Sequence, residues 1–336
     1  MTTLEMSAKP AVPVRTPRVN LKQEGERFAL VGAWLLLIVT FGILMPDSFL
    51  SWRNFSTMFG SQAVLVVLTL GIIIPLTSGD FDLSGASTLT MSSMLIGVLN
   101  ARDGWGLAPT LIIALASGLV IGAVNAFFVL YFRIHSLIVT LGVGTFVNGL
   151  ILWISKSQTI SGVSMSLVEW VIINRLFGIP LAFFYALLLA AVIWYVLEYT
   201  IAGRRLLFVG RGREVSRLNG INVDRVRAVS FIVSGLIAAL AGVFYAGMTG
   251  SADPLSGLNL LLPAFAAAFL GATTISPGRF NAFGAVISVY FLVTGITGLT
   301  MLGADAYVQN LFYGGALVIA VALSQLVRNR QPQEFS

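Results

Sequence analysis

The sequence predicts an all-α membrane protein with about ten transmembrane helices, and composition is the first reason. Of the 336 residues, 57% are hydrophobic and only 10% are charged, and the mean hydropathy is +0.91. Soluble domains carry about 25% charged residues, so this chain has too little charge to cover a water-exposed surface and must meet lipid over most of it. The absence of cysteine excludes disulfides and thiolate metal sites.

Apolar runs without charge are the second reason. A bilayer core needs roughly 20 apolar residues per helix, and windows of that kind give the spans 28–45, 55–77, 83–100, 108–130, 136–154, 178–197, 228–247, 259–275, 280–300 and 307–327. Pro263 interrupts the eighth of these spans. The first span begins at Phe28, after a tail rich in proline and basic residues that is unlike a cleavable signal peptide.

The basic residues set the expected orientation, because cytoplasmic loops of membrane proteins are enriched in Lys and Arg. With the N-terminus inside, 16 of the 20 basic residues fall on the cytoplasmic side. The predicted organisation is a cytoplasmic tail at 1–27, a membrane domain at 28–327 that includes a cytoplasmic loop at 200–227, and a cytoplasmic tail at 328–336. Because the basic residues are dispersed over short connections, the net charge of +6 does not indicate nucleic-acid binding.

Two polar segments suggest an internal repeat. TSGDFDLSG (77–85) and TGSADPLSG (249–257) both begin with Thr and end in Leu-Ser-Gly, and both follow an apolar span. About five spans in each half would place the second half upside down, the inverted five-plus-five arrangement that is common in transporters. The alternative is coincidence among Gly, Ser and Asp residues in membrane loops.

Missing residues exclude several activities. A Walker A loop needs Gly-Lys-Ser/Thr to hold phosphates, and none of the three lysines follows a glycine. A single histidine, His135, excludes an HExxH zinc site, and it lies beside Arg133 at an expected membrane edge. We therefore expect a protein that is not an enzyme and that needs no cofactor or metal.

The segment 203–227 is the longest expected cytoplasmic connection and holds seven basic residues. Residues 213–219 predict a short helix with Val215 and Leu218 on one face, ended by Gly220. Asn222 or Asp224 would cap the next span. A helix this short is marginal in water unless it docks. A partner-docking role is favoured over a simple positive anchor, which explains the arginines but not the amphipathic helix.

Three motifs, in order, carry a family resemblance. The run VGRGREVSRLNGINVDRVRAVSFIVSGLIAALAG (209–242), the Gly-x-Phe-Asp-Leu-Ser element at Gly79–Ser84, and FLGATTISPGRFNAFGAVI (269–287) resemble the permease subunits of ribose-type, carbohydrate-importing ABC transporters over residues 30–327. The sequence departs from the family pattern at three places, and these departures bear on the substrate class and not on the transporter type. Asp82-Leu83-Ser84 continues as Gly85-Ala86 instead of Val-Gly, the usual double glycine is Gly271-Ala272, and Pro277-Gly278 replaces another double glycine.

The resemblance implies partners. It predicts a multi-pass subunit of the bacterial inner membrane that works as a pair, with a second permease copy in a homodimer or heterodimer. A separate cytoplasmic ATP-binding subunit would dock beneath it, and a periplasmic substrate-binding protein would deliver solute. It also maps the coupling to the ATPase onto the cytoplasmic loop, at Glu214, Val215, Ser216, Arg217, Leu218, Gly220 and Ile221.

The carboxylates at 80 and 82 are the most unusual feature of the membrane domain, because a carboxylate there is expensive and usually faces protein or water. Neighbouring glycine and serine allow the backbone to unwind. Three roles stay open for Asp82, namely a structural hydrogen-bonding role, a place on the solute pathway, or a solvated loop. The resemblance favours Asp82, with Gly79 and Ser84, over the variable position of Asp80.

Polar residues inside the expected spans are further candidates for the pathway. Interhelical hydrogen bonding is the more ordinary role for each, and they are Asn125, Thr140, Asn148, Ser288 and Asn310.

The predicted function is the permease subunit of an ATP-driven importer for a small polyhydroxylated solute, a pentose, hexose or polyol. Related permeases for another solute, such as a nucleoside or an amino acid, remain an alternative. A secondary transporter that uses Asp80 or Asp82 as an ion site is a third reading, and it would have no need of the docking segment at 213–221. A structural scaffold would have little use for so many polar residues inside spans.

Overall fold

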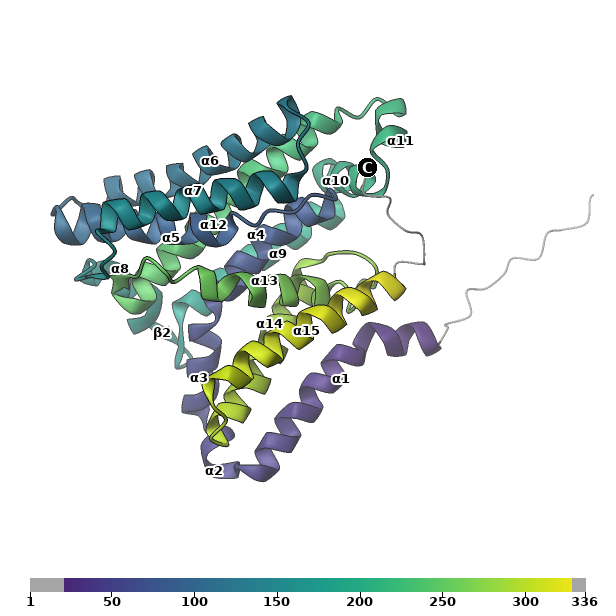
Figure 1. Cartoon of the computed structure of the whole chain (residues 1–336). Helices are drawn as coiled ribbons and strands as arrows, with labels where there is room; N and C mark the ends of the chain where they lie inside the picture. The colour runs from purple at the N-terminus through teal and green to yellow at the C-terminus, as the bar shows by residue number, and fades with distance from the viewer. Residues whose placement is uncertain (1–20, 328–336) are drawn as a thin grey trace, which may run out of the picture.

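The computed structural model describes residues 21–327, with side chains described for 28–323, and this part of the chain is almost entirely helical (Figure 1). The predicted tails lie outside the described residues at 1–20 and 328–336, and α1 begins within the predicted N-terminal tail. The α-helices are α1 Leu21–Leu44, α2 Pro46–Phe49, α3 Trp52–Ser61, α4 Ala63–Thr77, α5 Gly85–Ile96, α6 Leu107–Tyr131, α7 Ser136–Ser155, α8 Met165–Val168, α9 Leu181–Tyr199, α10 Ile201–Arg211, α11 Arg213–Leu218, α12 Val223–Thr249, α13 Leu258–Gly271, α14 Ala282–Met301 and α15 Ala306–Val327.

The remaining elements are short. Two π-helical segments, Gly97–Arg102 and Glu169–Ile173, continue α5 and α8. Strand β1 (Ile160–Ser161) pairs antiparallel with β4 (Ser251–Ala252), and β2 (Arg175–Leu176) pairs antiparallel with β3 (Ile179–Pro180). The β1–β4 pair joins two connections that are distant in the sequence, with Ile160 opposite Ala252.

Within the described residues, seven helices are long and apolar enough to cross a membrane, and two apolar segments, Phe28–Leu44 and Leu258–Gly271, are shorter. The predicted class, an all-α multi-pass membrane protein, is therefore confirmed. The number ten and the orientation stay predictions. Two expected spans are interrupted: the third is α5 with its π-helical end, and the eighth is α13, which contains Pro263 and has only 14 residues.

Helix α4 is the centre of the fold. All of its residues from Ala63 to Thr77 are buried, and it packs against α9, α12, α13 and α14. A helix that is apolar on every side lies either in a protein core or in lipid, and the complete burial of α4 places it in the protein core. Consequently, whatever happens at the two ends of α4 takes place inside the protein and not against lipid.

Helices α6 and α12 approach each other closely through glycine. A side-chain carbon at Gly118 would lie 2.2 Å from the carbonyl oxygen of Gly235, and one at Gly122 would lie 2.4 Å from that of Phe231. Small residues at such crossings let helix backbones meet within a membrane. This contact fixes α12 beside α6, and α12 also packs against α5 and α4.

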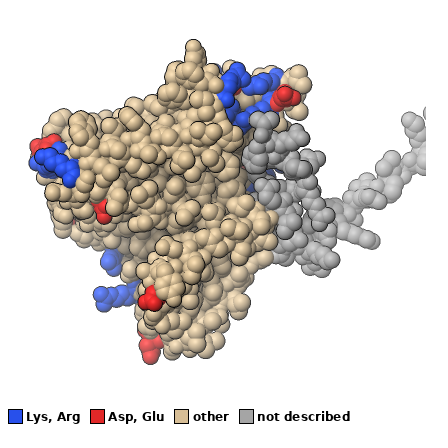
Figure 2. Space-filling view, viewed as in Figure 1, with Lys and Arg blue, Asp and Glu red and all other residues tan. Residues whose placement is uncertain are grey.

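On the face that Figure 2 shows, exposed charged side chains lie at the margins of the molecule. In Figure 2, Lys, Arg, Asp and Glu lie in a few places around a broad uncharged surface. Large exposed apolar residues cover α1, α6, α7, α9 and α15, for example Leu36, Phe127, Trp153 and Leu188. That surface is suited to lipid contact, as the low charge content of the sequence predicts.

Candidate functional site

The chain breaks between α4 and α5, at the segment that holds the two carboxylates. Helix α4 ends with Gly79 in a left-handed conformation (φ +78°). The N–H of Gly79 donates to the carbonyl of Leu76 at 3.2 Å, and that of Asp80 donates to the carbonyl of Pro75 at 2.9 Å. These two bonds and the left-handed glycine form a Schellman helix end, so Gly79 is the residue that stops α4.

Two hydroxyl groups of α7 satisfy the backbone between the helices. Ser136 Oγ accepts the N–H of Phe81 at 3.1 Å, and Thr140 Oγ1 accepts the N–H of Leu83 at 3.1 Å. Residues four apart on a helix lie on one face, and alternate residues of an extended segment share a side. The spacing of Ser136 and Thr140 therefore matches that of Phe81 and Leu83, and both backbone N–H groups find their partner within the protein.

Asp82 is completely buried and accepts three hydrogen bonds. Its Oδ1 receives the Ser84 hydroxyl at 2.6 Å and the Ser84 N–H at 3.1 Å, and its Oδ2 receives the Ser234 hydroxyl at 2.8 Å. The Asn125 amide in turn donates to Ser84 Oγ at 2.7 Å. This network ties the start of α5 to α6 and α12. These contacts are those of a hydrogen-bonding residue within the fold, which is one of the three roles left open for Asp82.

Asp80 is also buried and is held by two arginines. Arg227 donates Nε–H to Oδ2 at 2.7 Å and Nη2–H to Oδ1 at 2.7 Å, and Arg213 donates Nη2–H to Oδ1 at 3.1 Å. The Arg227 side chain is only 9% exposed. Bidentate pairing of this kind is the strongest carboxylate contact that arginine makes. Sequence reasoning ranked Asp80 below Asp82, yet Asp80 makes the stronger electrostatic contacts.

Helix α12 holds both carboxylates on one face. Arg227, which binds Asp80, and Ser234, which binds Asp82, are seven residues apart, so they lie two turns apart on the same side of the helix. Between them, Ser230 Oγ lies 3.4 Å from Ser78 Oγ. Ser78, Asp80 and Asp82 at the break thus each contact a polar residue on one face of α12, namely Ser230, Arg227 and Ser234 respectively.

Helix α10 brings the predicted coupling loop to this break. The expected loop is more ordered than predicted, because residues 201–211 form a helix that Thr200 caps by accepting the Gly203 N–H at 3.3 Å. A side-chain carbon at Gly210 would lie 2.0 Å from the carbonyl oxygen of Thr77, the last residue of α4. The predicted coupling loop therefore packs directly on the end of α4.

Arg213 connects the short helix α11 to the same place. Besides Asp80, it donates to the carbonyl oxygen of Gly79 at 3.1 Å. Burial lowers the pKa of the Arg213 guanidinium, and the Asp80 carboxylate opposes that shift. Arginine stays charged throughout the physiological range, so the contact is a permanent ionic link between α11 and the helix break.

The predicted short helix exists as α11, and its ends are as the sequence indicates. Gly220 takes a left-handed conformation (φ +76°), and the Ile221 N–H returns to the Ser216 carbonyl at 3.0 Å. The side chain of Asn222, and not that of Asp224, caps α12 by accepting the Arg225 N–H at 2.9 Å. Asp224 Oδ1 instead lies 3.4 Å from Arg217 Nη2. Arg217 therefore forms its ion pair with Asp224, across the turn, and not with Glu214.

The predicted apolar anchors of α11 face outward. Leu218 is 88% exposed and Val215 is 64% exposed, whereas Ser216 is buried and fixes the opposite face. Val215 and Ile221 also line a surface groove with Phe208 of α10. Figure 2 shows basic side chains gathered at the corner where α10 and α11 lie in Figure 1. The corner thus combines exposed apolar side chains with positive charge.

The other predicted residues divide into two groups. Asn125 and Thr140 lie at the helix break, through their contacts with Ser84, Leu83 and Phe81. Ser288 is buried in α14 and donates to the Gly284 carbonyl of its own helix. Asn148 is half-buried on α7, and Asn310 is exposed on α15. The structure does not bring these last three residues to the break.

Sequence reasoning missed Arg213, Arg227, Ser136 and Ser234 as members of the site. The two arginines were counted only as cytoplasmic charge, and both serines lie in apolar spans where serine is common. One signal was present, because Arg227 and Ser234 share a helix face that points two polar groups toward one side. The described residues hold no cluster of three or more His, Cys, Asp or Glu that could bind a metal.

Comparisons with known proteins agree on one family. The family model described as branched-chain amino acid transport system / permease component matches residues 54–321. No solved structure shows a significant match. The chain is 30% identical to the D-allose transport system permease protein AlsC of Escherichia coli (strain K12), over 87% of this chain and 89% of the relative.

Two further relatives cover similar lengths. The xylose transport system permease protein XylH of the same strain is 24% identical, over 96% of this chain and 98% of the relative. The fructose import permease protein FrcC of Rhizobium meliloti is 27% identical, over 88% and 84%. Such relatives are transport subunits and not enzymes. The chain therefore belongs to the family of permease components of transport systems of the branched-chain amino acid type.

Proposed function

We propose that this chain is the membrane subunit of an ATP-driven importer for a small polyhydroxylated solute, a monosaccharide or polyol. The named solutes of the relatives, allose, xylose and fructose, support this solute class. The chain forms the translocation pathway, and a separate ATPase supplies the energy. Alternating access moves the solute, as the two ends of the pathway open in turn.

One observation carries the ATP-driven reading: α11 presents exposed apolar side chains while it is bound ionically to the break after α4. Helix-in-groove docking uses apolar anchors three or four residues apart, and Val215 and Leu218 have that spacing and exposure. A cytoplasmic ATPase that binds α11 would displace Arg213 when it moves, and Arg213 contacts Asp80 and Gly79. Movement of the ATPase would thereby reach the buried end of α4.

The full assembly follows from the same proposal. A second permease copy, identical or related, completes the pathway, and a periplasmic binding protein delivers solute on the side opposite α11. The subunit lies in the bacterial inner membrane with about ten spans and with both termini inside, an orientation that the distribution of basic residues supports. In this proposal residues 213–221 couple the ATPase to the permease, and the break around Asp82 holds the fold of the pathway.

A self-powered carrier is the other candidate, and the carboxylates do not favour it. A proton or cation site needs a carboxylate with free coordination, as in transporter proton relays. Asp80 already has two guanidinium partners, and Asp82 accepts three hydrogen bonds from serine. Importers of another small solute, such as a nucleoside or an amino acid, would share the architecture, and they remain an alternative that the transport assay distinguishes.

Reconstitution tests the proposal. Permease, ATPase and binding protein are purified together and placed in liposomes, and uptake of labelled D-allose, D-xylose and D-fructose is measured with ATP on the ATPase side. We expect at least one sugar to accumulate only when both ATP and the ATPase are present. Uptake by the permease alone in response to an imposed proton or sodium gradient would contradict the proposal and favour the self-powered carrier.

A further inference from the structure

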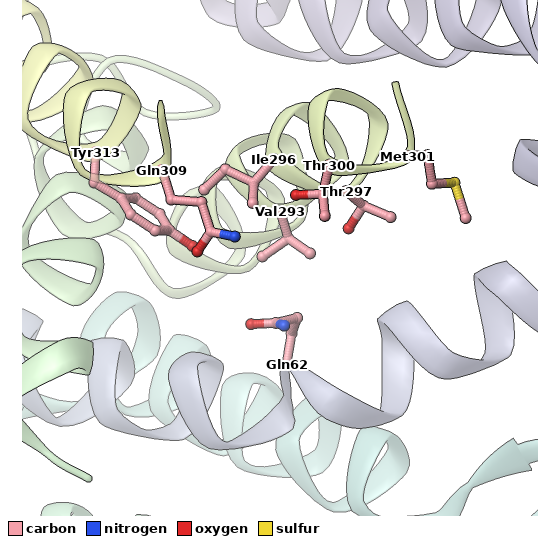
Figure 3. Close-up of a pocket in the computed structure, with 8 residues that line it drawn as sticks. All are labelled: Gln62, Val293, Ile296, Thr297, Thr300, Met301, Gln309 and Tyr313. Atoms are coloured by element: carbon pink, nitrogen blue, oxygen red, sulfur yellow. The ribbon is translucent and has the colours of Figure 1, made fainter. Parts of the chain in front are cut away.

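A cavity lies at the end of α4 opposite the helix break. Gln62 stands at the start of α4, and α14 and α15 supply the remaining lining residues, Val293, Ile296, Thr297, Thr300, Met301, Gln309 and Tyr313. Its volume is about 330 Å³, at the small end of the roughly 300–1,000 Å³ of ligand pockets. In Figure 3, Gln62 lies on one side, and Gln309, Tyr313 and Thr297 face it from the other.

Two threonines in this cavity differ from every other threonine in the described helices. Eleven others donate their hydroxyl to the carbonyl four residues earlier, the usual way that threonine satisfies itself inside a helix. Thr297 and Thr300 make no such bond to any described residue. Their hydroxyl groups are therefore left available to a ligand at the cavity.

The other polar side chains of the cavity are available as well. Among the described residues, the Gln309 amide and the Tyr313 hydroxyl have no hydrogen-bond partner, although both side chains are half-buried. The Gln62 amide makes only one long contact, 3.3 Å to the neighbouring Ser61 hydroxyl. Thr300 is exposed and the other four polar residues are half-buried, so the hydrogen-bonding capacity of all five groups is open to a ligand that enters the cavity.

The chemistry of the lining defines which ligand fits the cavity. All five polar groups are neutral, and together they offer both donors and acceptors: two amides, two aliphatic hydroxyls and one phenol. A solute with several neutral hydroxyl groups matches such a lining. An amino acid does not, because its carboxylate and ammonium groups would need charged partners when they leave water, and no charged side chain lines the cavity.

We infer that this cavity is a contact site for the transported solute, that it recognises neutral hydroxyl groups, and that Thr297 and Gln309 are its principal polar contacts. This inference rests on the proposed function. The cavity lies at one end of α4 and the coupling segment at the other, about 22 Å apart for a helix of this length. A solute held there is therefore placed on the side where a binding protein would release it.

Two nearly isosteric variants test the site in the complete transporter. Thr297→Val and Gln309→Leu remove hydrogen-bonding groups and keep the volume, and Thr297→Ser keeps the hydroxyl. The matched controls are Thr145→Val, whose hydroxyl bonds to its own helix on the exposed side of α7, and Gln158→Leu in an exposed loop. Uptake of labelled D-allose, D-xylose, D-fructose and L-leucine is measured at saturating solute in liposomes, together with ATPase activity stimulated by the loaded binding protein.

We expect Thr297→Val and Gln309→Leu each to reduce sugar uptake about three- to tenfold, the effect of one neutral hydrogen bond. Thr297→Ser and both controls should keep wild-type uptake, and stimulated ATPase activity should be unchanged in all variants. Sugar uptake at the wild-type rate in both cavity variants would overturn the inference alone. If the wild-type transporter carries L-leucine, or none of the sugars, the proposed function fails, and the inference fails with it.

Discussion

Asp80 and Arg227 form a buried bidentate ion pair although 147 residues separate them in the sequence, with Nε–Oδ2 and Nη2–Oδ1 distances of 2.7 Å each. Arg213, at the start of α11, binds the same carboxylate. Three parts of the chain therefore meet at one group: the end of the buried helix α4, the start of α12 and the segment proposed to bind the ATPase. This junction links α11 at the surface directly to the buried helix α4.

The first prediction concerns the stability of that junction. Asp80→Asn leaves Arg227 buried without its counter-ion, and breaking a buried pair on one side costs about 3 kcal/mol or more. We expect a clearly lower midpoint of thermal unfolding in detergent and less folded permease in the membrane. The control is Asp103→Asn, whose partner Arg102 is exposed and whose loss should cost less than about 1 kcal/mol. Equal midpoints for the two variants would show that the Asp80 pair contributes little.

The second prediction separates hydrogen bonding from charge at Asp82. Asp82→Asn keeps an oxygen acceptor for Ser84 and a polar group near Ser234, whereas Asp82→Leu leaves both serines without their partner. We expect the Asn variant to retain substantial uptake and the Leu variant to yield much less folded permease on fluorescence-detected gel filtration. A Leu variant with wild-type yield and uptake would exclude the structural role.

The third prediction tests the contact between α10 and α4. In Gly210→Ala the new carbon would meet the Thr77 carbonyl at 2.0 Å, so α10 must move away, at a strain typical of overpacking, about 1–3 kcal/mol. We expect uptake to fall several-fold while the amount of permease in the membrane changes little. Gly212→Ala is the matched control, because it has extended backbone and its nearest neighbour atom is at 3.8 Å. Uptake that is unaffected by Gly210→Ala would separate α10 from coupling.

The fourth prediction concerns orientation. Because 16 of the 20 basic residues lie on one side of the predicted ten-span arrangement, a reporter fused after Arg330 should be cytoplasmic. A reporter inserted near residue 165, in the connection between α7 and α9, should be periplasmic. Paired alkaline phosphatase and green fluorescent protein fusions distinguish the two sides. Both reporters on the same side would refute the ten-span arrangement.

The membrane class and the short helix α11 could be predicted because they depend on local features. Low charge and apolar runs are properties of segments, and the left-handed Gly220 and the cap at Asn222 follow from residues a few positions apart. The extent of α13 was harder to predict. Its apolar run continues to residue 275, but the helix ends at Gly271. The side-chain amide of Asn281 donates to the carbonyl oxygens of Gly271 and Thr274, and it thereby holds the segment after Gly271 in turns.

The partners of the carboxylates could not be predicted, because they depend on which helices meet. Nothing in a single sequence states that Arg227 faces Asp80 or that Ser136 faces Phe81. The same applies to the cavity at Gln62, which needs residues from α14 and α15. Asn148, Ser288 and Asn310 were candidates because of their polarity alone, and they lie away from the helix break. Polarity identifies a residue but does not identify its neighbours in the fold.

The central claim is that α11 delivers the energy of ATP hydrolysis, and replacement of its outermost apolar side chain tests it most directly. Leu218 is 88% exposed in the permease alone, so Leu218→Asp should leave the fold intact. If the ATPase encloses this side chain, its loss removes roughly 1.5–3 kcal/mol of apolar burial and places a carboxylate in an apolar groove. The control is Leu255→Asp, in an exposed position of the connection between α12 and α13.

The measurement is co-purification of the ATPase with each tagged permease, with ATP-driven sugar uptake recorded on the same preparations. The account predicts that Leu218→Asp reaches the membrane in normal amounts but recovers little ATPase and shows almost no uptake, while Leu255→Asp recovers as much ATPase as the wild type. Equal recovery of the ATPase and equal uptake for Leu218→Asp and the wild type would contradict the coupling role of α11.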